Sequence, residues 1–384
     1  MLARVLPLEE GKDLLPRAQH KPFPLRIIKI FLLFLSLGVV ISVLSVYTTR
    51  YFDVKNVILQ PRLGLIQQCF TEENEFKRWI KPPSSSKHSM NDEELFWRAS
   101  FVPQLKKYPH KRVPKVAFMF LTRGPLPLSP LWERFFEGHE EYYSIYIHSL
   151  PNYKDEFKSG SVFYQRQVPS QVAEWGKMSM CDAERRLLAN ALLDLSNERF
   201  VLVSESCIPL HNFSIIYQYL IKSRTSFVGS FDDPTPHGRG RYNSRMYPEV
   251  TLAQWRKGAQ WFEVNRELAV KLVSDTKYYP KFKDYCRPAC YVDEHYFPTM
   301  LSIETPNLIA NRTVTYVDWS RGGAHPATFG KGDITEAFLK RIIEGQKCLY
   351  NGQPSSLCFL FARKFAPSAL EPLLNITNTL LGFS

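Results

Sequence analysis

One uncharged apolar run near the N-terminus constrains this chain more than any other feature. Residues 30–49 read IFLLFLSLGVVISVLSVYTT, without a single charged side chain. A helix of about 20 apolar residues can cross the hydrocarbon core of a bilayer. The run is too long and begins too late for a cleaved signal peptide, and it lacks the polar face that a helix on a protein surface shows. We therefore expect a membrane anchor at residues 30–49.

The charges that flank the run predict its orientation. Residues 1–29 hold six basic side chains, whereas residues 50–55 hold two. The cytoplasmic flank of a membrane anchor carries the excess of Lys and Arg. We therefore expect a cytoplasmic tail at 1–29 and a luminal body at 50–384, the arrangement of a type II membrane protein.

Cysteines and glycosylation sequons agree with a luminal body. The seven cysteines all follow the anchor, where redox conditions permit disulfides; they are Cys69, Cys181, Cys207, Cys286, Cys290, Cys348 and Cys358. Because seven is odd, at least one is free or pairs between chains, and the pairing stays open. The irregular spacing of the last four, and the lumen, disfavour a zinc site. Sequons place candidate glycosylation sites at Asn212, Asn311 and Asn375.

The net charge of +12 raises the question of a nucleic-acid partner. The basic residues are spread among acidic ones, without a long block of Lys and Arg. This distribution equally suits a luminal enzyme that handles nucleotide-sugars or acidic glycans. Together with the anchor, it leads us to expect no nucleic-acid partner. The sequence does not predict an oligomeric state.

Two regions follow the anchor. Residues 50–110 have the composition of a stem, with a charged stretch, the run PPSSS at 82–86 and a short helical pattern at 92–99. Residues 111–384 are expected to form the catalytic domain. Its first segments alternate between apolar runs and amphipathic patterns, which is the signature of an α/β fold.

Three apolar runs at 115–122, 143–148 and 199–204 are typical of strands that are buried on both faces. Helical patterns at 130–136 and 179–195 separate them, which predicts βαβ units and a mostly parallel central sheet. Ligands of such sheets bind beyond the carboxyl ends of the strands. The residues expected there, as nucleotide-binding candidates, are Thr122, Arg123, His148 and Glu205. For Arg123 and His148 a structural role is the alternative.

Eight short strings carry a family resemblance. In chain order they are EWGKMSM (174–180), AERRLLA (183–189), LVSESCIPL (202–210), GRGRY (238–242), WRKGAQWFE (255–263), DEHYFPT (293–299), VDWSR (317–321) and LFARKF (360–365). From about residue 115 to residue 367 the chain resembles the core-2/I-branching β-1,6-N-acetylglucosaminyltransferases, and it looks closest to their plant branch.

The resemblance implies a GT-A-like fold, residence in the Golgi membrane, and inverting transfer from a UDP-sugar without a metal or other cofactor. The sugar is expected to be N-acetylglucosamine, and the acceptor a glycan on a glycoprotein or a polysaccharide. The alternative hypothesis is a catalytically inactive, membrane-tethered relative that binds glycans or scaffolds other glycosyltransferases.

An inverting transfer needs a carboxylate that accepts the proton of the acceptor hydroxyl. The resemblance places this catalytic carboxylate at Glu294. Its neighbour Asp293 could cap a helix that begins there, with Glu294 in the first turn, which is a common structural arrangement. The two interpretations are compatible, because one carboxylate can cap while the other faces the acceptor.

The departing UDP needs positive charge. The sequence contains no Asp-x-Asp motif that would hold a metal, so arginine or lysine should neutralise the diphosphate. The resemblance places the phosphate-binding lysine at Lys364, beside Arg363. It also implies a second arginine where this chain has Gly345, and we expect Lys347 to replace it.

Five residues are candidates for binding the acceptor. Asp232 and Asp233 are adjacent, so on an extended segment they point to opposite faces and chelate a metal poorly; they either form a turn or bind an acceptor hydroxyl. Trp261 offers a ring for a sugar, with core packing as the alternative. Trp319 and Arg321 are expected to line the same cleft.

Overall fold

The computed structural model describes residues 25–58, 80–81, 83, 85–101, 108–154 and 156–383. The chain divides into two compact units, residues 1–75 and 76–384, which are described separately. The first contains α1 (Leu25–Ile58), whose segment Lys29–Thr48 has a mean hydropathy of 2.6 and is fully exposed. This helix fits a membrane anchor. It continues to Ile58, so the expected stem begins as helix, while residues 1–24 and 59–79 lie outside the described part.

A four-stranded sheet forms the centre of the second unit, with strand order β2-β1-β3-β5. Strands β1 (Lys115–Leu121), β2 (Tyr143–His148) and β3 (Asn197–Ser204) run parallel, and β5 (Glu263–Asn265) pairs antiparallel with β3. The three parallel strands confirm those predicted from apolar runs. Together they confirm a mixed α/β fold with a mostly parallel central sheet.

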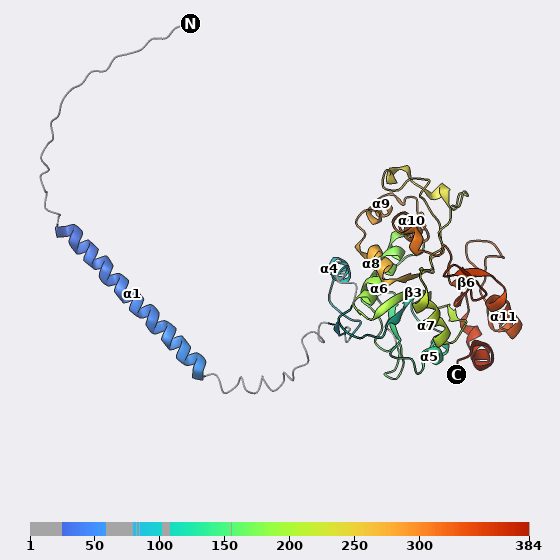
Figure 1. The fold of residues 1–384 in the computed structure, drawn as a ribbon, viewed down its shortest axis with the longest axis horizontal. Helices are drawn as coiled ribbons and strands as arrows, with labels where there is room; N and C mark the ends of the chain where they lie inside the picture. The colour runs from blue at the N-terminus through green and yellow to red at the C-terminus, as the bar shows by residue number, and fades with distance from the viewer. Residues whose placement is uncertain are drawn as a thin grey trace, which may run out of the picture. The chain divides into compact units, whose positions relative to one another are not determined.

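Helices cover both faces of this sheet (Figure 1). The helices α5 (Ser129–Phe136) and α6 (Met178–Leu192) connect the parallel strands, as predicted. Figure 1 shows α6 and α8 (Arg266–Ser274) on one side of β3, and α5 and α7 (Phe213–Lys222) on the other. Because both faces are covered, the strand side chains are almost all buried, which explains the continuous apolar runs.

A second, smaller sheet has the strand order β4-β9-β6. In it β9 (Phe361–Arg363) pairs antiparallel with β4 (Ile208–Pro209) and parallel with β6 (Thr315–Val317). The remaining elements are the hairpin β7 (Cys348–Tyr350) and β8 (Gln353–Ser355), and the helices α9 (Tyr279–Tyr285), α10 (Val292–Glu304), α11 (Glu336–Glu344) and α12 (Leu370–Ile376). Short helical turns lie at Arg239–Arg241, Ser244–Met246, Pro306–Leu308, Lys331–Asp333, Pro367–Ala369 and Thr377–Leu381.

The helix α4 (Asp92–Ala99) corrects the expected boundary of the stem. It buries Leu95 and Ala99 in the core of the second unit and packs beside α6. Asp92 accepts two hydrogen bonds from the buried Arg186, at 2.7 and 2.6 Å. A segment that we assigned to the stem therefore belongs to the folded body, which begins well before residue 111.

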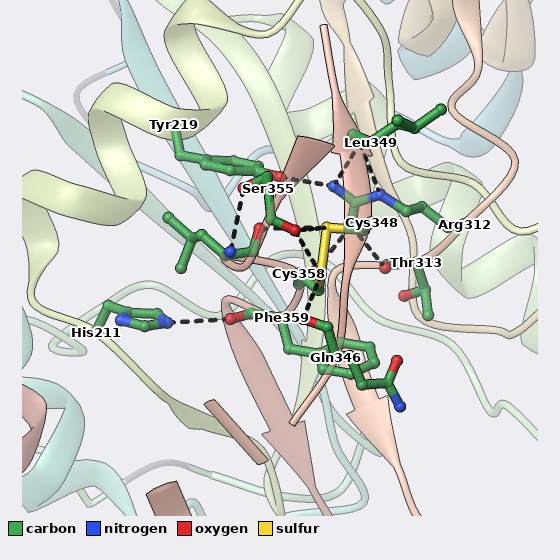
Figure 2. Close-up of a disulfide and its surroundings, with 11 residues drawn as sticks. His211, Tyr219, Arg312, Thr313, Gln346, Cys348, Leu349, Ser355, Cys358 and Phe359 are labelled. Carbon is green, nitrogen blue, oxygen red and sulfur yellow. Dashed lines mark hydrogen bonds between the residues drawn. A yellow bond between two sulfur atoms is a disulfide. The ribbon is translucent and has the colours of Figure 1, made fainter. Parts of the chain in front are cut away.

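Two disulfides bridge short segments of the second unit, Cys286–Cys290 and Cys348–Cys358. Figure 2 shows the second bridge, beside Arg312. Arg312 donates to the backbone oxygen of Cys358 at 2.8 Å and to the hydroxyl of Tyr219 at 2.6 Å. The four cysteines therefore pair as disulfides, as we favoured over zinc. Cys181 and Cys207 are free and buried, and Cys69 lies outside the described residues.

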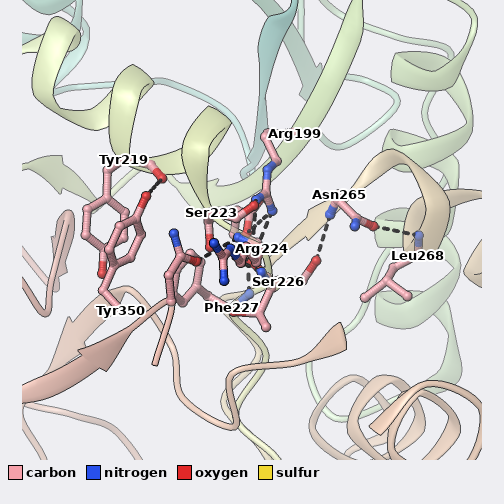
Figure 3. Close-up of polar contacts among 12 residues, drawn as sticks. Arg199, Tyr219, Ser223, Arg224, Ser226, Phe227, Asn265, Leu268 and Tyr350 are labelled. Carbon is pink, nitrogen blue, oxygen red and sulfur yellow. Dashed lines mark hydrogen bonds and ion pairs between the residues drawn. The ribbon is translucent and has the colours of Figure 1, made fainter. Parts of the chain in front are cut away.

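A buried ion pair ties β5 to β3. Arg199 and Glu263 lie 3.1 Å apart, and their side chains are 3% and 0% exposed. Arg199 also donates to the backbone oxygens of Ser223 and Thr225, the first of which is seen in Figure 3. Glu263 in turn accepts from the backbone N–H of Phe227. The pair thus connects the central sheet to the segment that leaves α7.

We expect Glu263→Ala to lower the free energy of unfolding by about 3–5 kcal/mol, because it leaves Arg199 charged and buried without its partner. Denaturant unfolding of the full-length protein in detergent measures this change. The control is Glu371→Ala, which breaks the exposed pair between Lys331 and Glu371 and should cost less than about 1 kcal/mol. Equal losses in both variants would contradict a structural role for the buried pair.

Candidate active site

The carboxyl ends of strands from both sheets meet at one edge of the second unit. Strand β3 is followed by Glu205 and Ser206, and β9 ends at Arg363 and is followed by Lys364. The backbone N–H of Phe365 donates to the oxygen of Ser206 at 2.9 Å, so these two strand ends lie against each other. Open α/β sheets bind ligands beyond such strand ends.

A group of cations lies at this edge. Burial lowers the pKa of Lys364, and the charges of Arg363 and Arg123 lower it further. Burial also lowers the pKa of Arg363, whose guanidinium lies 4.0 Å from the ring centre of Trp261. The negative charge of Glu205 opposes this change, because it raises the pKa of both Arg363 and Lys364. Three cations facing one carboxylate leave a net positive charge that suits an anionic ligand.

Glu294 lies in the first turn of α10, half-buried between two cations. Arg241 Nη1 is 3.6 Å from Glu294 Oε2, an ion pair slightly too long for a direct hydrogen bond. Burial raises the pKa of Glu294, and the charges of Lys257 and Arg241 oppose that rise. A carboxylate with a raised pKa that still reaches solvent is a better proton acceptor than an ordinary one.

Two further carboxyl groups lie behind Glu294. Glu184 of α6 is fully buried and accepts a hydrogen bond from Gln260 at 2.8 Å. Burial raises the pKa of Glu184 well above its ordinary value, and the charge of Asp293 adds to the rise. Burial and the charge of Glu294 raise the pKa of Asp293 to about 7. One oxygen of each buried carboxyl has no hydrogen-bond partner, so both groups are poorly solvated where they lie.

One segment, 257–262, connects the glutamate to the cations. Gly258 N donates to the backbone oxygen of Glu294 at 2.8 Å. Three residues further along, Trp261 lies beneath Arg363. A Cβ atom at position 258 would lie 2.0 Å from the carbonyl oxygen of Gly229, so only glycine fits this position. The segment therefore holds Glu294 at one end and Arg363 at the other.

Only some of the residues expected to bind the nucleotide lie close together. Arg123 and Glu205 lie near Lys364 at the strand edge. His148 instead faces α6, where its Nε2 accepts from Arg186 at 3.0 Å, and burial together with Arg186 lowers its pKa to about 3. Thr122 is buried and its hydroxyl closes the turn at Gly124. The structure therefore favours the structural alternative for His148, and it gives Thr122 a role in the turn.

The residues expected to bind the acceptor also lie in different surroundings. Asp232 pairs with Arg239, while Asp233 caps a turn at Thr235 and lies 3.5 Å from Lys257, itself near Glu294. The two carboxylates thus face different partners, as their adjacency predicts. Trp261 is 6% exposed, so the structure favours packing for it rather than contact with an acceptor.

Trp319 and Arg321 follow β6 and are exposed. Strand β6 runs parallel to β9, with Val317 opposite Arg363, so both residues follow the strand end that lies beside Lys364. That they line the same cleft stays a prediction.

The structure favours a place for Lys347 outside the cationic group. It precedes Cys348, which is bonded to Cys358, and Cys358 comes before the first residue of β9. Lys364 instead follows the last residue of that strand.

The three glycosylation candidates differ in accessibility. Asn212 is half-buried and caps α7 by accepting from Ile215 N at 2.9 Å. Asn311 is exposed, and its side-chain oxygen accepts from Ser230 N at 2.7 Å. Asn375 is exposed on α12. Asn311 and Asn375 are therefore more accessible for attachment of a glycan than Asn212.

A cavity of about 450 Å³ lies near the amino ends of the strands, between Lys115, Ser144 and Asp194, and so away from the cations. A second cavity, of about 330 Å³, is lined by Arg241 and Arg287. Because Arg241 pairs with Glu294, the second cavity lies beside the proposed base.

Several residues near Glu294 were missed by sequence reasoning. They lie in strings that we had noted only for their resemblance: Trp175, Glu184, Arg241 and Lys257. Tyr291 precedes another string and stacks under Arg241 at 4.1 Å. Their charged and aromatic side chains were a usable signal, but nothing in the spacing showed that they share one place.

Comparison with known proteins gives two matches. Residues 116–343 match the family model described as Core-2/I-Branching enzyme. A protein of Oryza sativa subsp. japonica named Glycosyltransferase BC10 is 39% identical, over 68% of this chain and 76% of the relative. The matched family segment contains Glu294 and Arg241 and ends before Lys364.

The buried carboxyl groups predict a pH dependence of stability. Because the folded-state pKa of Asp293 is raised from 3.8 to about 7, its stabilising contribution is complete below about pH 4 and is lost as the pH rises through 7. We expect Asp293→Asn to reduce this loss by on the order of 2–4 kcal/mol. Glu184→Gln should reduce it in the same direction, because burial raises the pKa of Glu184 as well.

Unfolding free energies of the full-length protein, measured between about pH 4 and pH 8, test this expectation. Glu371→Gln changes an exposed carboxylate and serves as the control. A loss of stability that is as steep in both buried variants as in the unmodified protein would show that neither group holds a proton.

Proposed function

This chain belongs to the core-2/I-branching enzyme family and is a glycosyltransferase, and from this premise we propose that it transfers N-acetylglucosamine from its UDP form to a glycan with inversion. The observation that carries the proposal is the placement of Glu294 and Arg363 at the two ends of segment 257–262. A base and a cation pair held by one rigid segment can act on the two sides of one sugar.

Glu294 is the proposed base. It takes the proton of the acceptor hydroxyl as the hydroxyl oxygen bonds to the anomeric carbon, while the bond from that carbon to the UDP oxygen breaks on the opposite face. The raised pKa of Glu294 supports this role, because proton transfer is most effective when the pKa of the base is close to the working pH. The configuration at the anomeric carbon inverts in this single displacement.

The leaving UDP gains negative charge, and Lys364 with Arg363 is proposed to balance it. Lysine and arginine act as fixed cations for phosphate groups. The half-buried position of Lys364 supports the role, because its charge is less screened than that of an exposed lysine. Arg123 lies at the same edge and is proposed to contact the nucleotide with them. No divalent metal is required in this scheme.

The proposed setting is the Golgi membrane, with the catalytic body in the lumen. The apolar helix α1 and the excess of basic residues before it support this orientation. The two disulfides also suit an oxidising compartment. The acceptor proposed for this setting is a glycan carried by a glycoprotein or a polysaccharide.

We expect Glu294→Gln to lower kcat for sugar transfer by about 10²–10⁴-fold, because the amide cannot accept the proton. Radiolabel transfer by the full-length protein, offered a panel of UDP-sugars and glycan acceptors, measures it. The control is Glu304→Gln. Glu304 lies at an exposed position of the same helix, so this change should leave kcat unchanged. Unchanged turnover in Glu294→Gln would exclude it as the base, and no transfer by the unmodified protein would support the inactive relative.

We expect Lys364→Ala to raise the Kd for UDP about 10–100-fold, because a charge-assisted phosphate contact contributes about 1.5–3 kcal/mol. Calorimetric titration with UDP measures this, and Lys347→Ala, at the other end of β9, is the matched control. EDTA should leave transfer intact. Activity that disappears in EDTA and returns with Mn²⁺ would contradict the proposed cation clamp.

A further inference from the structure

The loop before α6 exposes a tryptophan that the proposed chemistry does not use. Trp175 is 47% exposed, although a large apolar ring usually gains free energy by burial. It lies in the string EWGKM, between Glu174 and the glycine at 176. Its position is not that of a lone surface ring, because two other aromatic side chains pack against it.

Three loops that are far apart in the sequence converge at Trp175. The ring of Tyr291 meets it edge to face, with centroids 4.9 Å apart, and the ring of His325 lies 5.3 Å away. Gly176 has a φ of +75°, and a Cβ atom there would lie 3.2 Å from the Tyr291 ring. This glycine lets the loop close against Tyr291, so the indole is held in place.

A short series of contacts leads from Trp175 to the proposed base. Tyr291 precedes α10, and its backbone oxygen accepts from Glu294 N at 3.0 Å. Its ring supports the guanidinium of Arg241 at 4.1 Å, and Arg241 pairs with Glu294. The exposed indole is therefore on the side of the site that holds the base, while the cations for UDP lie at the far end of segment 257–262.

The position of Trp175 beside the proposed base indicates which ligand its exposed ring contacts. A base must contact the hydroxyl that it deprotonates, so the surface next to Glu294 faces the acceptor rather than the nucleotide. A pyranose ring has a face of C–H groups that packs on an aromatic ring, while its hydroxyl groups bond to nearby polar side chains. Trp, with a large rigid ring and an N–H donor, suits such amphipathic ligands.

We propose that Trp175, supported by Tyr291 and His325, is a stacking site for a sugar ring of the acceptor glycan. The proposal rests on the function proposed above and extends it, because it gives the acceptor a contact beyond the reacting hydroxyl. His325 lies in the loop that also carries Trp319 and Arg321. An acceptor with more than one sugar would therefore bind more tightly than a monosaccharide.

Calorimetric titration of the full-length protein in detergent tests the stacking site. The probes are hexasaccharides of β-linked glucose, xylose and galactose and a complex N-glycan, each compared with its monosaccharide. We expect Trp175→Ala to raise the Kd of a bound probe about 3- to 10-fold, the loss of one aromatic contact of about 0.5–1.5 kcal/mol. Trp175→Phe should recover most of the affinity.

Trp97→Ala provides the matched control, because Trp97 is 68% exposed on α4 and lies outside the site. The proposal is overturned if Trp175→Ala binds the glycan probes as tightly as the unmodified protein does. It is also overturned if Trp97→Ala loses as much glycan affinity as Trp175→Ala, or if no probe binds the unmodified protein. An equal loss of UDP affinity in Trp175→Ala would place the ring at the nucleotide instead. Binding is measured without turnover, so a failure of Glu294 as base leaves this test intact.

Discussion

The backbone contact between Gly258 and the chain around it is the constraint on which the site depends. Lys257 pairs with Phe231 through two backbone hydrogen bonds of 2.9 Å, and Gly258 bonds to the first turn of α10. The segment has room for no side chain at Gly258, because the oxygen of Gly229 occupies that position. The proposed base and the proposed phosphate ligand Arg363 therefore contact the two ends of one short segment.

Burial, more than pairing, determines the electrostatics of this site. The half-buried Glu294 and the buried Asp293 and Glu184 all have raised pKa values, and Lys364 has a lowered one, with burial as the largest cause in each case. Raised pKa values favour the neutral forms of Asp293 and Glu184, which would repel the charge of Glu294 less than two carboxylates.

Much of the fold could be predicted from the sequence, because local patterns determine it. The strands at 115–121, 143–148 and 197–204 are nearly those read from apolar runs. The segment that we assigned to the stem includes α4, which is amphipathic in any context; its packing on the body depends on partners far along the chain, such as Arg186, 94 positions away. Lys347 is a similar case, because a disulfide joins the residue after it to the segment before β9.

The sequence by itself determined the apolar helix that fits a membrane anchor, the parallel strands and the family, because hydrophobic period and short motifs are local properties. The tertiary structure alone decided which motif residues meet. It turned His148 toward Arg186, buried Trp261 beneath Arg363, and assembled Trp175, Tyr291 and His325 from separate loops. Contacts between distant segments depend on how the elements pack, and spacing along the chain carries no record of that.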